Sequence, residues 1–186
     1  HSVNAIRIDE NGSHGAGMDG KGAVKAIMGA GVRLDGINAL IYGAGGISGV
    51  VAYELSQQNV KKIYIANRTR EKAEKIADIL KNNTATDAEV IGTDPYSLNK
   101  VAEQCGLFAN LTPLGMKGCA NKYDYLGFID RMPDDAAVFD CVINPPMTDV
   151  IAAAKKNGLT AVPGMKMLVS QMDVIFDFMF NKKITE

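Results

Sequence analysis

The sequence has little cysteine, and this narrows the classes of protein to which it can belong. Its 186 residues contain three cysteines, Cys105, Cys119 and Cys141, which lie far apart and form no Cys-x-x-Cys pair. An odd number at these spacings argues against a disulfide framework and against a cysteine-ligated metal site. We therefore expect free thiols, a reducing compartment and no bound metal.

The sequence also lacks an excess of charge of one sign and lacks long apolar runs. The formal net charge is -1 and the two signs are interspersed, so no basic stripe could follow a nucleic-acid backbone. No window approaches the roughly 18 apolar residues that a membrane-spanning helix requires, and the N-terminus lacks a signal-peptide pattern. The sequence predicts a cytoplasmic protein that binds neither nucleic acid nor a membrane.

Short apolar runs alternate with longer stretches of helical period, which is typical of a parallel α/β sheet. The expected strands are residues 37–42, 62–66, 88–91, 107–110 and 137–142. The expected helices run from the loop after residue 42 to about residue 58, and over 70–81, 96–104, 148–157 and 164–180. The order predicts an α/β, Rossmann-type, doubly wound and mostly parallel sheet with helices on both faces.

The first 36 residues do not continue this alternation. We expect a strand over residues 3–8, a polar turn over 10–14 and a helix over about 20–30. This pattern predicts that residues 1–36 are a segment connecting to another domain, and that residues 37–186 form a nucleotide-binding domain with a C-terminal helix.

A glycine-rich loop follows the first predicted strand of that domain. It begins with Gly43, Ala44, Gly45, Gly46 and Ile47, and a predicted helix comes next. Glycines at this place permit a tight turn and let a pyrophosphate approach the helix N-terminus. The loop predicts a dinucleotide site, and a purely structural turn is the alternative.

The end of the next predicted strand indicates which dinucleotide binds. An NAD-binding domain commonly has an acidic residue there, about 20 residues beyond the loop, whereas this chain has Asn67 followed by Arg68, Thr69 and Arg70. Asparagine brings no charge to repel a 2′-phosphate, and a guanidinium can clamp one. The sequence therefore favours NADP, although both arginines could instead be solvated residues at a helix start.

Four separated stretches resemble the shikimate and quinate dehydrogenases. They are Ser2-Val3-Asn4-Ala5, Asn67-Arg68-Thr69, Asn110-Leu111-Thr112-Pro113-Leu114-Gly115-Met116 and Gly164-Met165-Lys166-Met167-Leu168-Val169-Ser170-Gln171. The resemblance implies an NADP-dependent oxidoreductase that interconverts a ring alcohol and a ring ketone. It also implies an N-terminal substrate domain of roughly a hundred residues, carrying a catalytic lysine, which is missing from this chain.

The resemblance also implies roles for individual residues. Asn4 and Gln171 would bind the substrate, and Asp19 would be both a substrate ligand and the catalytic partner of the missing lysine. The nicotinamide side would be lined by Thr112, Pro113, Leu114, Ile143, Gly164 and Met167. Judged on its own, Asp19 could equally well cap the helix that follows it.

Two departures from the family pattern bear on the substrate. Gly17-Met18 stands where the family usually has Asn-Thr before the aspartate, and Ile143 stands where a tyrosine is common. Both changes remove hydrogen-bonding groups, so shikimate or a different hydroxylated ring carboxylate would fit.

From these observations we expect the chain to bind NADP but not to catalyse the reaction by itself. A stand-alone NADP-binding or regulatory module is the alternative. Apolar surface left without its partner domain would also promote a homo-oligomer.

Overall fold

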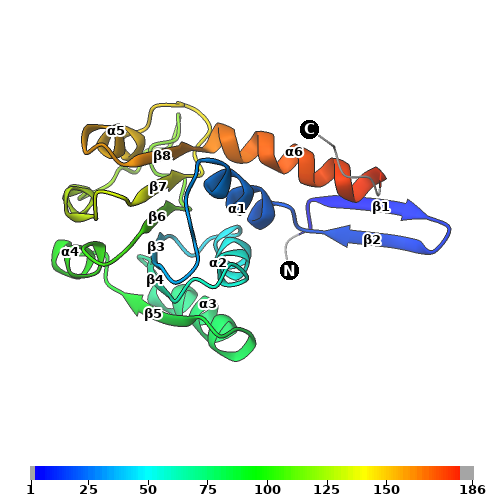
Figure 1. Ribbon diagram of the computed structural model, residues 1–186, viewed down its shortest axis with the longest axis horizontal. Helices are drawn as coiled ribbons and strands as arrows, with labels where there is room; N and C mark the ends of the chain where they lie inside the picture. Colours follow the sequence, from blue (N-terminus) through cyan, green and yellow to red (C-terminus); the bar gives the residue numbers. More distant parts are fainter. Residues whose placement is uncertain (1–2, 181–186) are drawn as a thin grey trace.

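The computed structural model describes residues 3–180, which form a parallel six-stranded sheet flanked by helices and a separate antiparallel hairpin (Figure 1). The strands are β1 (Ala5–Asp9), β2 (Gly12–Ala16), β3 (Asn38–Tyr42), β4 (Lys62–Ala66), β5 (Asp87–Ile91), β6 (Leu107–Asn110), β7 (Ala137–Asp140) and β8 (Thr160–Pro163). The helices are α1 (Asp19–Gly29), α2 (Ser48–Ser56), α3 (Arg70–Asn83), α4 (Pro95–Ala102), the 3₁₀ helix η1 (Gly127–Arg131), α5 (Asp149–Lys156) and α6 (Gly164–Phe180). The predicted fold class is confirmed.

The strand order is β5-β4-β3-β6-β7-β8, and every neighbouring pair is parallel. The chain moves outward from β3 in one direction and then returns to build β6 on the other side. Ligands of such sheets bind beyond the carboxyl ends of the strands at this point of reversal. The register aligns those ends, because Tyr42 lies opposite both Ala66 and Asn110, and Asn110 lies opposite Asp140.

Both faces of the sheet are buried, so its central strands are apolar on both sides. Helices α1, α2, α3 and α6 cover one face, and α4, η1 and α5 cover the other (Figure 1). On the second face the rings of Phe108 and Phe128 meet edge to face with centroids 4.9 Å apart, and both side chains are fully buried.

Helix α1 is wedged between α2 and α6 because two of its residues have no side chain. A Cβ on Gly20 would lie 2.5 Å from the Val50 carbonyl oxygen of α2, and one on Gly22 would lie 2.8 Å from Cβ of Gln171 in α6. This helix belongs to the segment that the sequence predicts as a connection, and it contributes Ala23 and Ile27 to the core over the sheet.

The polar turn expected over residues 10–14 is shorter in the structure, since only residues 10–11 form the turn and Gly12–Ala16 is strand β2, which pairs antiparallel with β1. The sequence of β2 has low strand propensity, and the strand forms through pairing with β1. The hairpin lies along the distal half of α6, away from the sheet (Figure 1), where Nη1 of Arg7 donates to the Phe178 carbonyl oxygen at 2.9 Å. Strand β8 and η1 were not anticipated. Within residues 3–180, no helix is long and apolar enough to cross a membrane.

Candidate functional site

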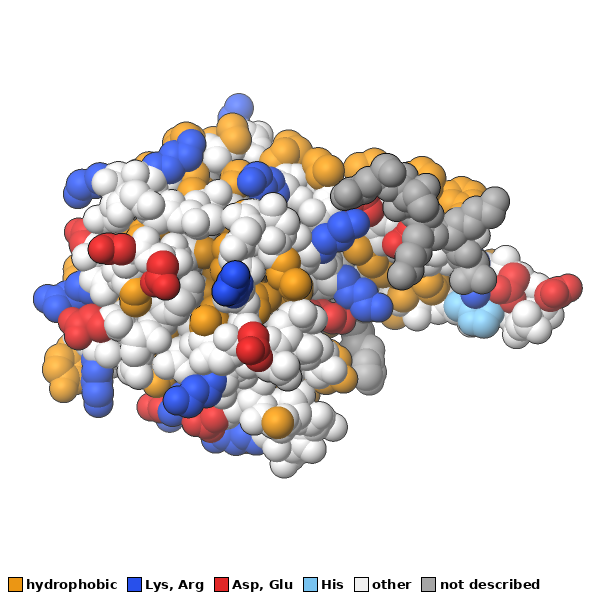
Figure 2. Space-filling model, in the orientation of Figure 1, with side chains coloured by type: hydrophobic (Ala, Val, Ile, Leu, Met, Phe, Trp, Pro, Cys, Tyr) orange, Lys and Arg blue, Asp and Glu red, His pale blue; other side chains and the backbone are white. Residues whose placement is uncertain are grey.

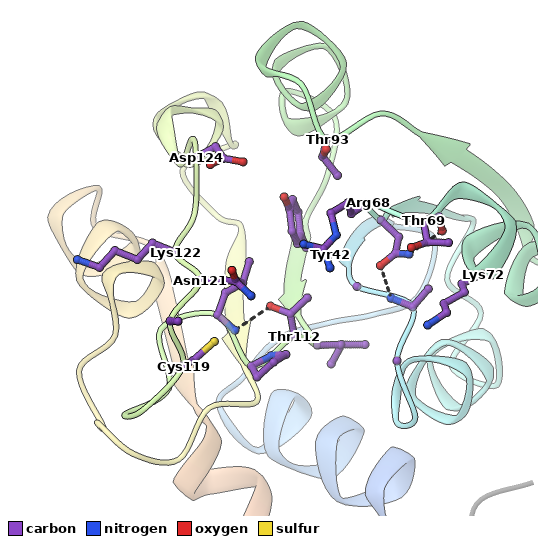
Figure 3. A pocket seen from close by; sticks show the side chains of 18 residues that line it. Tyr42, Arg68, Thr69, Lys72, Thr93, Thr112, Cys119, Asn121, Lys122 and Asp124 are labelled. Carbon is purple, nitrogen blue, oxygen red and sulfur yellow. Dashed lines mark hydrogen bonds between the residues drawn. The ribbon is translucent and has the colours of Figure 1, made fainter.

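A pocket of about 550 Å³ opens at the carboxyl ends of the parallel strands, at the point where the strand order reverses (Figure 3). It is lined by the last residue of β3, by the loops after β3, β4, β5 and β6, and by one residue of α3. The lining residues are Tyr42, Gly43, Ala44, Gly45, Asn67, Arg68, Thr69, Lys72, Thr93, Leu111, Thr112, Pro113, Leu114, Cys119, Ala120, Asn121, Lys122 and Asp124.

The glycine loop enters the pocket in a conformation that its first residue makes possible. Gly43 has a φ of +112°, and a Cβ there would meet Cγ2 of Thr112 at 2.6 Å. The backbone therefore passes close beside the β6 loop, which only glycine permits.

The backbone amides of this loop are only partly satisfied by the protein. The Ala44 amide donates to Oδ1 of Asn67 at 3.0 Å, and the Gly45 amide donates to Oγ of Ser48 at 3.0 Å. Among the described residues, the Gly46 and Ile47 amides have no acceptor, and they stand at the positive end of α2. Gly46 and Ile47 do not line the pocket but adjoin Gly45, which does.

The loop after β4 and the first turn of α3 each bring one cation to the pocket. Asn67 holds this loop in place, because its Nδ2 donates to the Thr69 carbonyl oxygen at 2.7 Å while its Oδ1 accepts from Ala44. Arg68 and Thr69 line the pocket as expected, and so does Lys72 in the first turn of α3 (Figure 3).

Arg70, which we expected beside them, lies outside the pocket lining. Its Nε donates to Oε1 of Glu74 at 2.8 Å, one helical turn further along α3. Lys72 takes the place expected for Arg70. The sequence carried a signal for Lys72, since it falls in the first turn of the helix expected over 70–81, directly after the loop that carries Arg68.

The β6 loop contributes three of the residues expected on the nicotinamide side, namely Thr112, Pro113 and Leu114. Three other expected residues lie outside the pocket lining. Ile143 is 40% exposed in the loop after β7, Gly164 begins α6 against the Cys141 and Val142 carbonyls, and Met167 is buried in the core together with Leu111.

A wall of the pocket that sequence reasoning missed is formed by residues 119–124, on the left in Figure 3. Tyr42 from β3 meets Tyr123 of this segment with ring centroids 5.5 Å apart. Burial raises the pKa of the Tyr42 hydroxyl, and the nearby Asp124 carboxylate adds to the rise. Cys119 also faces the pocket, and no motif in the sequence marked these residues.

The residues expected to meet the substrate are drawn together near the start of α1. Nε2 of Gln171 donates to Oδ1 of Asp19 at 2.9 Å, and Oδ1 of Asn4 accepts from the Met18 amide at 2.8 Å. Asp19 makes no side-chain capping bond to α1, whose N-cap residue is Met18. The observed contact of Asp19 is therefore with Gln171, across the α1–α6 interface, and not with the helix end.

Comparisons with known proteins agree with this geometry. Residues 22–93 match the family model of Shikimate / quinate 5-dehydrogenase. The chain is 33% identical over 178 residues to the shikimate dehydrogenase (NADP(+)) of Methanopyrus kandleri. The aligned region covers 95% of this chain and 61% of that protein. The shikimate 5-dehydrogenase of Listeria monocytogenes, solved with shikimate and NAD, superimposes with a TM-score of 0.88 at 26% identity, covering 98% of this chain and 64% of that one.

The ligand-free 5-ketofructose reductase of Gluconobacter sp. strain CHM43 is also similar, with a TM-score of 0.84 at 26% identity over 99% of this chain and 65% of that one. The chain thus spans about three fifths of the length of these proteins and matches the C-terminal part of the curated relatives.

Proposed function

The chain belongs to the shikimate and quinate dehydrogenase family, and from this premise we propose that it is the NADP-binding part of an oxidoreductase of the shikimate dehydrogenase type. The observation that carries the proposal is the pocket where the glycine loop meets the cations Arg68 and Lys72, next to the Gly46 and Ile47 amides, which have no acceptor among the described residues. A bound nicotinamide would supply or accept the hydride. The residues of this chain would hold and orient the cofactor.

The loop after β4 suits a nucleotide that carries a 2′-phosphate. Asn67 stands where an acidic residue commonly takes the ribose hydroxyls of NAD, and its side chain is engaged by Ala44 and Thr69. No carboxylate from this loop lines the pocket, whereas Arg68 and Lys72 do. A guanidinium and an ammonium can together contact a phosphate dianion, which favours NADP over NAD.

The start of α2 suits the pyrophosphate of the same cofactor. The Gly46 and Ile47 amides lack an acceptor among the described residues and lie at the positive end of the helix. A Cβ on Gly45 or Gly46 would meet no atom within 4 Å, so this side of the loop is open to a ligand.

The other end of the cofactor would extend toward Thr112, Pro113 and Leu114. We place the nicotinamide on this side of the pocket, with Ile143, Gly164 and Met167 flanking it. The pair formed by Asp19 and Gln171 would meet the hydroxyls of the ring substrate, with Asn4 beside them. An aspartate can share movement of a hydroxyl proton with a lysine, and the family resemblance puts that lysine in the part of the relatives that these 186 residues do not cover.

We propose further that the 186 residues alone bind NADP without catalysing turnover, and that their exposed apolar surface makes them self-associate. A stand-alone NADP-binding or regulatory module is the competing proposal. The two are separated by adding an N-terminal domain of a relative in trans. Restored oxidation of shikimate would support the enzyme, and unchanged inactivity despite a formed complex would favour the module.

The substrate is proposed as a class. Shikimate is named with the Listeria relative, while another similar structure is a 5-ketofructose reductase. Gly17, Met18 and Ile143 offer no side-chain hydrogen-bonding group. We therefore propose shikimate or a related hydroxylated ring carboxylate, to be tested as a panel with the complemented enzyme.

The first experiment is calorimetric titration of the chain with NADP and, separately, with NAD. We expect NADP to bind more tightly. Replacing Arg68 by alanine should weaken NADP binding about tenfold or more, in line with the roughly 1.5–3 kcal/mol of a hydrogen bond to a charged group, and should leave NAD binding nearly unchanged.

Arg33→Ala is the matched control, because Arg33 is exposed and lies outside the pocket. Lys72→Ala should act like Arg68→Ala, and Arg70→Ala should act like the control. Equal affinity for NADP and NAD in the wild type would refute the cofactor assignment, and no binding of either would refute the proposed function.

A further inference from the structure

A carboxylate that the proposed cofactor site does not touch is buried directly behind it. Asp140 is the last residue of β7, at the same edge of the sheet as the pocket, and its side chain has no exposed surface. No salt bridge to it occurs within the described part of the chain, so neutral hydrogen-bond donors alone compensate for the charge. A carboxylate is costly to bury in this way, and an apolar side chain would fit a sheet core more cheaply.

Three donors converge on this carboxylate from different elements. Nδ2 of Asn110, at the end of β6, donates at 2.8 Å, and the Val142 amide, in the loop after β7, donates at 3.0 Å. Both reach Oδ1. Oγ1 of Thr148, the N-cap residue of α5, donates to Oδ2.

The contact with Asn110 fixes the orientation of an amide that faces the pocket loop. A carboxylate can only accept, so it draws the NH₂ group of Asn110 toward itself and turns Oδ1 of Asn110 the other way. That oxygen accepts from the amide of Thr112 at 3.0 Å and from its hydroxyl at 2.7 Å. Oγ1 of Thr112 in turn accepts from the Leu114 amide at 3.2 Å. The chain of bonds therefore runs from Asp140 to the turn that lines the pocket.

The contact with Val142 holds the neighbouring turn. Gly164 packs closely against the backbone of this turn, because a Cβ on Gly164 would lie 2.5 Å from the Val142 carbonyl oxygen. Ile143 follows directly. One buried carboxylate thus ties together the two loops that flank the proposed nicotinamide end.

We propose that Asp140 is a positioning residue, which acts through Asn110 on the Thr112–Leu114 turn and through Val142 on the loop after β7 to pre-form the nicotinamide half of the site. This inference rests on the proposed function, because it assigns the two loops to one half of a dinucleotide. The inference predicts an effect on one end of the cofactor only. Among the described residues, the hydrogen bonds around Asp140 do not reach Arg68 or Lys72, where the 2′-phosphate would bind.

The test compares NADPH with adenosine 2′,5′-bisphosphate, which lacks the nicotinamide half. We expect Asp140→Asn to weaken NADPH binding about tenfold, which is about 1.4 kcal/mol, and to leave the bisphosphate affinity unchanged. Binding to Asp140→Asn should also enhance the fluorescence of the nicotinamide less than binding to the wild type does. The reason is that the NH₂ group introduced at position 140 cannot accept from the surrounding donors, so the orientation of the Asn110 amide is no longer fixed. Asp134→Asn, an exposed site with the same loss of charge, should match the wild type on both ligands.

A second pair keeps the test decisive if Asp140→Asn does not fold, as judged by its thermal melt. Thr148→Val removes one of the three donors without changing side-chain shape, and should weaken NADPH several-fold more than the bisphosphate. Thr148→Ser retains the hydroxyl and should restore the wild-type values.

Equal weakening of both ligands in Asp140→Asn or Thr148→Val, or no weakening of either, would overturn the positioning role while leaving the cofactor site intact. A wild-type chain that bound neither ligand would overturn the proposed function and this inference with it.

Discussion

At the scale of single residues, the three thiols differ in their surroundings and should differ in reactivity. Burial raises the pKa of Cys105 and of Cys141 to about 12, so both remain protonated at neutral pH, and the thiolate is the reactive form. Cys119 is only partly buried and lines the pocket. We expect Ellman's reagent at pH 8 to titrate one thiol rapidly in the folded chain and the other two only after unfolding.

Two observations would identify that thiol. Cys119→Ser should abolish the fast phase, and saturating NADP should slow it in the wild type, because the cofactor would cover the pocket wall. Fast labelling that persisted in Cys119→Ser would show that Cys105 or Cys141 reacts rapidly and would contradict the assignment.

Substitutions at two glycines of the loop after β3 should separate an effect on folding from an effect on cofactor binding. Gly43→Ala places a Cβ in a left-handed conformation and 2.6 Å from Thr112, so we expect a loss of roughly 1–3 kcal/mol in the free energy of unfolding. Gly46→Ala meets no atom within 4 Å and should leave that free energy within about 0.5 kcal/mol of the wild type. It should nevertheless weaken NADP, because a methyl group would project where the pyrophosphate approaches. Urea unfolding and calorimetry on both variants check this, and unchanged NADP binding in Gly46→Ala would place the pyrophosphate elsewhere.

At the scale of elements, the sequence predicted best where one periodicity was unbroken. The strands at 62–66 and 107–110 and the helix at 164–180 have the bounds expected from their apolar runs. Strand β2 was missed because Gly12–Ala16 carries glycine, serine and histidine, and forms only through pairing with β1.

Residues that line the pocket were predictable where a turn at a strand end marks them, as at Gly43 and Asn67. Side chains were less predictable, because their direction depends on helix phase and on tertiary contacts. Arg70 turns to Glu74, and Met167 packs into the core. The wall at residues 119–124 comes from a long loop without a periodic pattern, so nothing in the sequence placed it at the pocket.

The edge of the sheet offers a prediction about pH. Nζ of Lys62 lies 3.1 Å from Asp87 and 2.7 Å from Glu89, bridging β4 and β5. The bond to Glu89 raises the pKa of Lys62. The resulting stabilisation of the fold is fully present below the ordinary lysine pKa and is lost as the pH rises through the raised pKa. The bond to Lys62 lowers the pKa of Asp87. The stabilisation from this bond is fully present above the ordinary aspartate pKa and is lost as the pH falls through the lowered pKa.

Lys62→Met should therefore destabilise the chain at neutral pH by less than about 1 kcal/mol, because the groups are largely solvated. The difference from the wild type should shrink at acidic pH, as the pH falls through the lowered pKa of Asp87. Urea unfolding at neutral and acidic pH measures it, with Lys61→Met as the exposed neighbour control. A difference that did not depend on pH would mean that the loss comes from packing on Tyr64 and not from the charges.

At the scale of the whole molecule, the distal part of α6 and the hairpin form an arm that leaves large apolar side chains in solvent (Figure 2). On α6 the exposed residues are Met165, Leu168, Val169, Met172, Phe176, Met179 and Phe180, and on β1 they are Ile6 and Ile8. Soluble monomers rarely expose apolar patches larger than a few hundred Å². Asp19 and Gln171, which we propose to meet the substrate, lie at the base of this arm, so whatever covers the apolar surface would also border the proposed substrate position.

We therefore expect the 186-residue chain to self-associate through this arm, since burying apolar surface between copies is favourable by about 25 cal/mol per Å². Sedimentation velocity over a wide range of protein concentration should show mass increasing with concentration. Val169→Glu and Phe176→Glu should shift the chain toward monomer, because each would place a charge in the contact. Ile79→Glu changes an equally exposed apolar residue on α3, far along the chain from the arm, and should leave association unchanged. A wild-type chain that stayed monomeric throughout would contradict the expectation, and dissociation by Ile79→Glu as well would move the contact away from the arm.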